Sequence, residues 1–551
     1  MVKRRKALYA IILIAITATA LVVARSYLLQ NVQDNLLDKI EQLNKSSLKI
    51  HYDTIYLDWK RNILTIEKLV VEKDAYDTTC LYPEFLSCQK LTVDGLGVLS
   101  LIFQNELHID EVTLFKPHAV IHEKSELFLD SASRKETEFD VYIERITIDS
   151  LRMEMTDSAK CSLVTGLRSS GSLHDLNIAM RPDRPLDFSF SEIKTNGTRI
   201  DLPRSFYTFT IHQTNLNLHD HSFAMDTLRV IPSFNKLQFG RRAGNDVDRI
   251  EGVVPFLKIS NLNLQYTDTV IVDAGNADIQ FFFKLFHDKR LPHKQKVVPL
   301  PIAQLRLIPF GLSLNELKIT KSYVEYEEVP ANADEAGKVF FDNLEGTLSS
   351  ITNDGANPNG EMVLKAKADF MGHAKLVVEN HSPWNTRKNS TVKGSLSRLS
   401  FAKLNSMVEP AANIEFETGT LNRLDFAFQY NDRASSGEVA INYQDLKIVS
   451  YRTDEQIEKV GKKKRNQRKS EEELRKDNLK TFIINAFVVR KNMDESMPEE
   501  KRTGTISFER DRSRSVFNFW WKSLFTGIKS AFNLDKAEAT VQKLKGNKKN
   551  K

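Results

Sequence analysis

The sequence lacks the motifs by which most enzymes are recognised. Its 551 residues contain no Gly-rich phosphate loop, no nucleophile elbow and no zincin motif. Carboxylate pairs such as Glu327 with Glu328, and Glu499 with Glu500, lie among many other charged residues and single out no acid–base couple. The sequence therefore predicts no catalytic residue, no cofactor and no enzymatic activity.

Cysteine is scarce, which excludes a disulfide framework. The three cysteines, Cys80, Cys88 and Cys161, do not have metal-ligand spacing. Cys80 and Cys88 could close a hairpin loop around Pro83 in an oxidising compartment, or they could be two buried thiols. Cys161 is unpaired in either case.

Three histidines, His212, His219 and His221, lie close together in the sequence. Leu216 and Leu218 place these histidines at the edge of an alternating strand. A solvated turn explains the group better than a metal site, so we predict no metal centre.

A strong charge of one sign is also missing. The chain has 78 Lys and Arg against 72 Asp and Glu, a net charge of +6 that is small for its length and requires no nucleic acid. Locally, a basic run at residues 462–469 precedes three glutamates at 471–473. We interpret residues 455–480 as a solvated charged linker leading into a helix, with contact to anionic headgroups as the alternative.

Long hydrophobic runs are absent except for one near the N-terminus. Residues 7–24 are uncharged and apolar, long enough to span a bilayer as a helix, and four basic residues at 3–6 precede them. We predict a cytoplasmic tip and transmembrane helix at 1–28, with the remaining residues on the far side of the membrane. A signal peptide cleaved near Ala18 and Ala20 is the alternative. Without a cysteine near the run, a lipoprotein anchor is not supported.

Beyond this run, apolar residues at helical spacing in residues 29–47 predict a capping helix. Residues 48–454 then read as strand after strand, because apolar and polar residues alternate in short runs. A large, mainly β body of antiparallel strands is expected, with a brief helix near residues 404–410.

A short pattern recurs within this body: apolar, polar, apolar, two polar, apolar, polar, apolar. Strict copies occupy residues 86–93, 107–114, 257–264, 312–319 and 441–448, and looser copies begin at Leu64, Val141 and Phe223. We interpret the polar pair as a bulge or tight corner that lets both halves of a strand face the same way. Repeated bends of this kind would curl a long sheet.

The C-terminal part, residues 481–533, is expected to hold final strands and an amphipathic helix. Aromatic and aliphatic residues of 516–533 fall largely on one helical face beside two lysines. This spacing suits either a helix at a membrane interface or a helix docked on the end of the sheet. The membrane-interface candidates are Trp520, Trp521, Lys522, Leu524 and Lys529, and residues 534–551 are predicted to be a disordered basic tail.

Several stretches together resemble the AsmA-like proteins of bacterial envelopes. They are the N-terminal anchor with its short helix, then residues 48–50 (LKI), 55–58 (IYLD), 64–69 (LTIEKL), 109–117 (IDEVTLFKP), 418–426 (TGTLNRLDF) and 437–448 (GEVAINYQDLKI). The resemblance covers most of the chain. It implies a long curved β-sheet groove whose concave face is apolar and carries acyl chains.

The resemblance and the anchor together predict a single-pass inner-membrane protein, with its N-terminus cytoplasmic and its bulk periplasmic. It would carry or bridge phospholipid in outer-membrane biogenesis. Candidate groove residues are Leu257, Ile259, Leu262, Leu264, Leu312, Leu314, Leu317 and Ile319. If the same residues instead pack in a closed sandwich or barrel, the chain is a scaffold for other envelope proteins. An unrecognised envelope hydrolase is the third alternative.

Overall fold

The structure, a computed structural model, describes residues 48–58, 61–73, 85–96, 106–122, 139–157, 163–180, 187–266, 269–353, 359–451 and 490–532. The predicted membrane helix, capping helix, charged linker and basic tail lie outside these residues. Among the described residues, no helix has the length and apolarity needed to cross a membrane.

The described chain is mainly β, as predicted. Its 24 strands belong to one hydrogen-bonded sheet. They are β1 (Leu48–His51), β2 (Thr54–Asp58), β3 (Ile63–Lys73), β4 (Phe85–Asp94), β5 (Glu106–Phe115), β6 (His118–His122), β7 (Phe139–Thr156), β8 (Leu163–Met180), β9 (Asp187–Ser189), β10 (Glu192–Leu202), β11 (Tyr207–Asn217), β12 (Ser222–Pro232), β13 (Arg249–Ser260), β14 (Asn263–Tyr266), β15 (Val270–Asp288), β16 (Gly311–Val329), β17 (Gly337–Thr352), β18 (Glu361–Phe370), β19 (Ala374–Pro383), β20 (Ser390–Leu396), β21 (Leu399–Ser400), β22 (Ile414–Tyr430), β23 (Ala434–Ser450) and β24 (Thr503–Glu509).

Helices are few and short among the described residues. They are the 3₁₀ turns η2 (Pro203–Ser205), η3 (Phe401–Leu404) and η5 (Glu499–Lys501), and the α-helices α4 (Lys236–Ala243), α5 (Pro301–Leu305), α6 (Asn405–Ala412) and α10 (Val516–Ala531). Helix α6 confirms the brief helix predicted near residues 404–410. Helix α10 confirms the helix predicted in the C-terminal part.

The chain divides into two compact units. Unit 1 comprises residues 1–233 and 253–272, and unit 2 comprises 234–252 and 273–551. Each unit is described by itself below.

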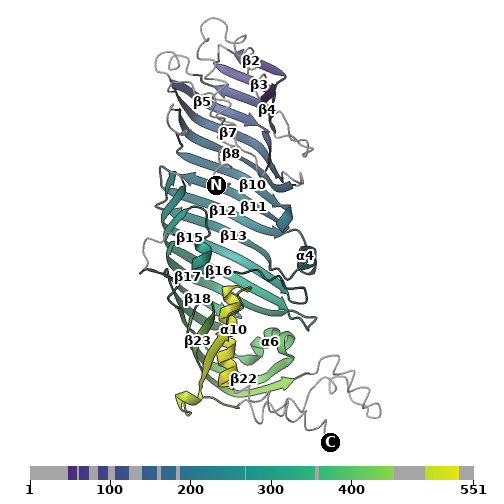
Figure 1. Cartoon of the computed structure of the whole chain (residues 1–551), viewed down its shortest axis with the longest axis vertical. Coiled ribbons are helices and arrows are strands. Elements are labelled where there is room, and N and C mark those ends of the chain that lie inside the picture. The colour runs from purple at the N-terminus through teal and green to yellow at the C-terminus, as the bar shows by residue number, and fades with distance from the viewer. Residues whose placement is uncertain are drawn as a thin grey trace, which may run out of the picture. The chain divides into compact units, whose positions relative to one another are not determined.

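Most strands of unit 1 pair antiparallel with the strand that follows them in the chain. The ladders β7–β8, β10–β11 and β11–β12 are of this kind, and β8 pairs antiparallel with both β9 and β10 (Figure 1). Strands β5 and β6, however, both pair with β7 in parallel. The prediction of a wholly antiparallel sheet is therefore wrong here. Alternation reports which face a side chain occupies but not the direction of the strand, so the sequence could not reveal this pairing.

A polar pair forms a bulge in β7, directly after the pattern copy that begins at Val141. Strand β7 gains one residue relative to β8 between Ile148 and Leu151, where Ser150 has φ +61°. As a result Ile148 pairs with Gly171, and Met153 pairs with Leu167. Gly171 and Leu167 are four residues apart on β8, so they lie on the same face of that strand. The bulge therefore keeps apolar residues before and after it on the same side.

Positive φ occurs in the polar pair of four of the eight pattern copies. The copies beginning at Leu64, Phe223, Leu257 and Ile441 contain Lys68, Thr227, Asn261 and Asp445, with φ between +47° and +56°. In the other four copies, neither polar residue has positive φ. Half of the copies therefore have the backbone of a tight corner in the polar pair, and at Asp445 the register of β23 against β22 also shifts, as in a bulge.

Thr227 is the residue in these polar pairs at which a positive φ causes the most strain, because its side chain is β-branched. Its φ is +47°, and a β-branched side chain in the left-handed region costs about 1 to 2 kcal/mol. We expect Thr227→Gly to raise the free energy of unfolding of unit 1 by about 1 kcal/mol, measured by hydrogen exchange of the β11 and β12 amides. The matched change Thr210→Gly, at an extended position of the adjacent strand, should lower it by a similar amount. Equal effects at both positions would contradict this account.

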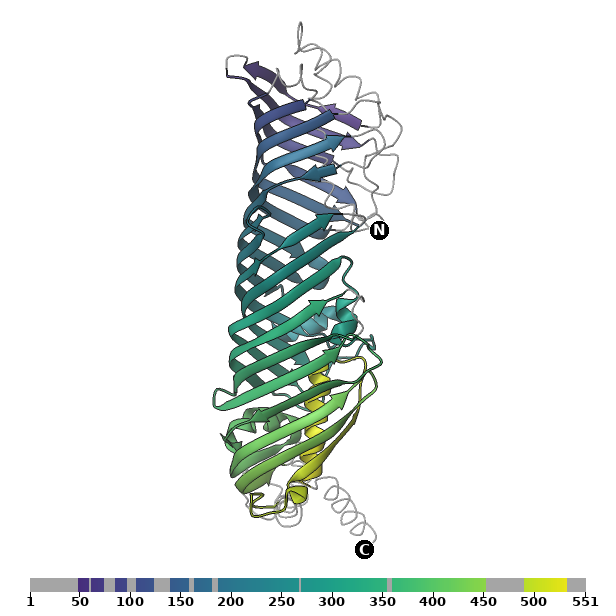
Figure 2. The ribbon, with the colours of Figure 1, turned by 90° about the vertical axis from the view of Figure 1, so that its left-hand side faces the viewer.

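Unit 2 continues with antiparallel ladders. Strands β16 to β20 pair in order, β20 and β21 pair with β22, and β23 and β24 follow. Figure 2 shows α10 lying against the last of these strands.

Helix α10 docks through a row of small and aromatic residues one turn apart. Phe519, Ser523, Gly527 and Ala531 are buried against β23 and β24. A Cβ added at Gly504 of β24 would lie 2.1 Å from the Gly527 carbonyl oxygen, so the helix and strand approach closely only because glycine is present. Of the two alternatives for this helix, docking on the sheet is confirmed.

Candidate functional site

An apolar row crosses the sheet of unit 1 from strand to strand. The strand register places residues of β2, β3, β4, β5, β7, β8, β10, β11 and β12 side by side in this long apolar row: Leu57, Leu64, Val93, Val112, Ile146, Leu173, Ile193, Leu216 and Phe223. A short apolar row on β7, β8, β10, β11 and β12 consists of Met153, Leu167, Ile200, Phe209 and Val230. Together the rows form apolar stripes that run across the strands.

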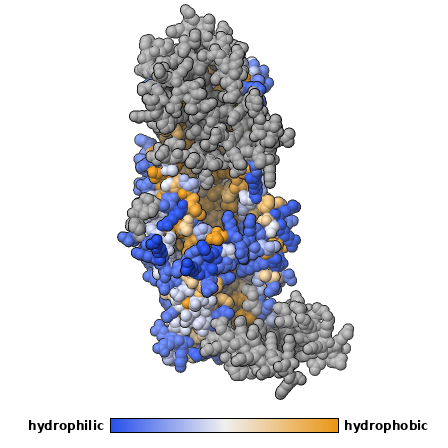
Figure 3. Space-filling view, in the orientation of Figure 1, coloured by the Kyte–Doolittle hydropathy of each residue, from blue (hydrophilic) through white to orange (hydrophobic). Residues whose placement is uncertain are grey.

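Burial changes along the long apolar row. From β3 to β7 its side chains are at most 4% exposed and belong to one hydrophobic core. From β8 to β12 its members Leu173, Ile193, Leu216 and Phe223 are only half-buried. Neighbours within a sheet cover the flanks of a side chain but not its end, so half-burial indicates a face without a complete second layer. Figure 3 shows hydrophobic residues beside hydrophilic ones on the face of the molecule that it draws.

The opposite face of these strands is charged. Four residues lie side by side across β8, β10, β11 and β12 on this face: Arg168, Arg199, Thr210 and Arg229. All three arginines are exposed. Asp201 accepts hydrogen bonds from Arg199 Nε at 3.0 and 3.1 Å. The two faces of unit 1 therefore differ sharply in polarity.

The first four groove candidates lie around β13 and β14. Leu257 and Ile259 are half-buried on β13, and Leu264 is half-buried on β14. Leu262, at the break between the strands, is 3% exposed, and its N–H donates to the His221 carbonyl oxygen at 2.8 Å. Leu262 therefore belongs to the packed core rather than to an open face.

The other four groove candidates lie together on β16 of unit 2. Leu314 pairs with Ile351, Leu317 pairs with Leu348, and Ile319 pairs with Gly346. Leu312, Leu314 and Leu317 contact a small core that includes Ile302 of α5 and Trp384. All four candidates are half-buried, whereas Asn315, Glu316 and Lys318 are exposed.

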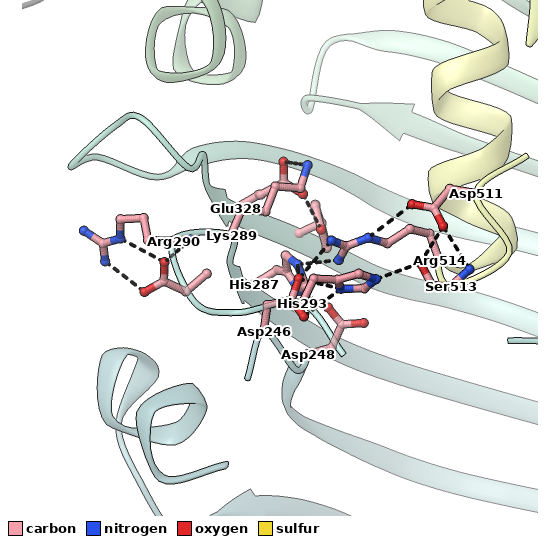
Figure 4. Close-up of polar contacts among 12 residues, drawn as sticks. Asp246, Asp248, His287, Lys289, Arg290, His293, Glu328, Asp511, Ser513 and Arg514 are labelled. Carbon is pink, nitrogen blue, oxygen red and sulfur yellow. Dashed lines mark hydrogen bonds and ion pairs between the residues drawn. The ribbon is translucent and has the colours of Figure 1, made fainter. Parts of the chain in front are cut away.

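A charged cluster in unit 2 joins segments that are far apart in the chain (Figure 4). Asp246 lies between α4 and β13, His287 is the next-to-last residue of β15, His293 follows that strand, and Arg514 precedes α10. The Arg514 guanidinium contacts the Asp246 carboxylate at 2.9 Å, and His293 Nδ1 lies 2.9 Å from the same carboxylate. His287 Nε2 lies 3.0 Å from Arg514 Nη1, and His287 Nδ1 lies 2.8 Å from Asp248.

This cluster is well shielded from water. The side chains of Asp246 and His287 are 5% and 6% exposed, and that of Arg514 is 19% exposed. Burial opposes the charged carboxylate, but hydrogen bonds from His293 and Arg514 outweigh it and hold the pKa of Asp246 below its ordinary value. The cluster thus clamps residues around Asp246, the segment after β15 and the start of α10.

Backbone hydrogen bonds strengthen the same clamp. The Asp246 N–H donates to the Pro292 carbonyl oxygen at 3.1 Å, and the Val298 N–H donates to that of Arg512 at 2.8 Å. The Arg510 side chain, fully buried, pairs with Asp432 and donates to the Val298 carbonyl oxygen. Residues 289–300 are therefore held as a strap between the Asp246 segment and residues 510–514.

The membrane-interface candidates on α10 divide between its two sides. Trp520, Lys522, Leu524 and Lys529 are half-buried, and Trp521 is 41% exposed. Phe517 and Phe525, one turn on either side of Trp521, are 75% and 46% exposed. The helix therefore docks through one side and presents an aromatic stripe on another.

The cysteine and histidine candidates form no metal site among the residues that the structure describes. Cys88 is a buried thiol that donates to the Lys90 carbonyl oxygen at 3.0 Å, while Cys80 and Cys161 lie outside the described residues. His212, His219 and His221 are exposed, and within the described ranges no group of His, Cys, Asp and Glu could hold a metal ion.

Sequence reasoning missed the charged cluster entirely. His287 and Arg514 are separated by 227 residues, and neither lies in a motif. No local pattern brings them together, because their contact depends on how the strap folds back onto the start of α10.

Comparison of the chain with protein-family models, characterised proteins and solved structures found no match. The functional argument therefore rests on the residues and geometry of the chain itself.

Proposed function

We propose that this protein carries phospholipid, with acyl chains lying against the apolar rows of unit 1. The observation that supports this most directly is the half-burial of the long apolar row from β8 to β12, on a sheet whose opposite face carries exposed arginines. An acyl chain covering such a face gains about 0.8 kcal/mol for each CH₂ removed from water. The chain has no motif for nucleotide binding, so the driving force would come from a gradient or a partner.

The location and process belong to the same proposal. The apolar run at residues 7–24 and the resemblance to AsmA-like proteins favour a single-pass anchor in the inner membrane, a periplasmic body and a role in outer-membrane biogenesis. Phospholipid is the expected partner, and nucleic acid is not expected.

A scaffold for other envelope proteins is the second candidate. The exposed arginines of unit 1 and the aromatic stripe Phe517, Trp521 and Phe525 favour it, because both are surfaces that another protein could bind. In that case lipid would not contact the apolar rows.

Photocrosslinking in the full-length protein distinguishes the two. We would place photoreactive benzoylphenylalanine at Phe209, on the short apolar row, or at Thr210, on the charged face, in cells labelled with ³²P-phosphate. Phe209 lies between Ile200 and Val230, and Thr210 lies between Arg199 and Arg229. We expect ³²P-phospholipid attached at position 209 and none at position 210. Protein adducts at position 210 with no lipid at 209 would instead support the scaffold.

A further inference from the structure

One cation near the charged cluster, Lys522, differs from the others in having no carboxylate partner among the described residues. Lys522 of α10 lies beside Lys289, Arg514, Asp511 and Glu328, close enough to interact electrostatically with all four. Lys289 already pairs with Glu328 at 2.5 Å, and Arg514 already pairs with Asp246 at 2.9 Å. The Lys522 ammonium makes no ion pair or hydrogen bond to any residue that the structure describes.

The nearby carboxylates are already engaged by other groups. Glu328 also accepts a hydrogen bond from the Tyr326 hydroxyl at 2.7 Å, and Asp511 accepts from the Ser513 N–H at 3.0 Å (Figure 4). Lys522 instead lies over the Phe508 ring, 5.8 Å from its centre, and is half-buried. Burial and the neighbouring Lys289 lower the pKa of Lys522. Its charge would be stabilised by an anion that the described residues do not supply.

The surroundings of Lys522 are amphipathic. Trp521 and Phe525 on the same helix are exposed, while Phe508, Trp520 and Leu524 contact the hydrophobic core of unit 2. An anion that binds here would have apolar side chains within reach, as a phosphate ester attached to acyl chains requires.

We propose that Lys522, beside Phe508, is the phosphate contact of a phospholipid-headgroup site on α10. This inference rests on the proposed lipid-carrying function and assigns it a headgroup site in unit 2. The phosphate would receive a charge-assisted hydrogen bond from the Lys522 ammonium, and its acyl chains would lie on the neighbouring apolar side chains.

Protection of lysines from an amine-reactive reagent tests the site in the full-length protein. The protein is held in uncharged detergent micelles with dioleoylphosphatidylglycerol, with diacylglycerol, with inorganic phosphate, or with no addition. The labelling rates of Lys522 and of Lys529, on the same helix, are read by peptide mass spectrometry. We expect phosphatidylglycerol alone to slow labelling of Lys522 by about fivefold while Lys529 changes little.

Each other outcome overturns the inference. Equal slowing of both lysines would mean that α10 rests on a lipid surface without a discrete site. Equal protection by inorganic phosphate would mean a site for free phosphate, and no protection would mean no anion site. Lipid crosslinking at Phe209 is measured in parallel: if it persists while Lys522 is unprotected, only the headgroup site fails, and if it is absent the proposed function fails as well.

A variant series provides a second readout. With benzoylphenylalanine at the exposed position 521, Lys522→Met should reduce the ³²P-phospholipid adduct by about fivefold, and Lys522→Arg should retain it because the cation is kept. An unchanged adduct in Lys522→Met would count against the site.

Discussion

Replacing Asp246 with alanine should lower the free energy of unfolding of unit 2 by about 3 kcal/mol. The carboxylate is 5% exposed and faces Arg514, His293 and His287. Its removal leaves the shielded guanidinium without its closest carboxylate, because Asp511, the other one, lies 3.9 Å away. Urea unfolding followed by tryptophan fluorescence measures this effect, because Trp384, Trp520 and Trp521 lie in unit 2.

Asp248 and a charge-free double variant are the controls. Asp248 is 48% exposed, so solvent screens its contact with His287, and Asp248→Ala should cost less than about 1 kcal/mol. Asp246→Leu combined with Arg514→Met should recover most of the loss, since neither charge then remains unpaired. Equal losses in Asp246→Ala and Asp248→Ala would show that the buried ion pair does not hold the strap.

The same contacts predict the sign of an acid dependence. Because the pKa of Asp246 is lower in the folded chain than in the unfolded chain, its contribution is fully present above the unfolded value of about 3.9. The contribution is lost as the pH falls through the lower folded value. Between pH 5 and pH 2 the wild-type protein should therefore lose more stability than Asp246→Ala does.

Placing a charge on the short apolar row should block lipid carriage. Phe209→Arg puts a guanidinium between Ile200 and Val230. About two or three CH₂ groups of an acyl chain that crosses this point would then lose their apolar contacts with the protein. At about 0.8 kcal/mol for each CH₂, we expect at least a tenfold loss of ³²P-phospholipid crosslinked at position 193 on the neighbouring row.

Thr208→Arg is the matched control on the charged face. Thr208 pairs with Asp201, to which its hydroxyl donates at 2.7 Å, so an arginine there finds a carboxylate opposite. We expect it to leave lipid crosslinking within about twofold of wild type. Equal losses in both variants, with the fold intact by circular dichroism, would argue against acyl chains on the apolar rows. Leu262 is unsuited to this test, because an arginine at a side chain that is 3% exposed would disrupt the core.

Local periodicity made several features of this fold predictable. Alternation on β11 and β16 identifies strands with faces of different polarity, and the helical spacing of residues 516–531 identifies α10. The doubled polar residues predicted the corner of positive φ at Thr227 and the bulge at Asp445, because a strand that keeps its apolar side on one face needs such an irregularity. These features depend on residues only a few positions apart, so the sequence contains them directly.

Tertiary structure decided what depends on distant partners. It paired β5 with β7 in parallel, buried Leu262 while leaving Leu216 half-covered, and brought Asp246 to Arg514. On α10, Phe519 and Gly527 are buried against the sheet and Trp521 is exposed. The helical spacing alone does not predict which of these residues face the sheet. Burial and charge pairing are properties of what surrounds a side chain, and those surroundings form only when segments far apart in the sequence meet.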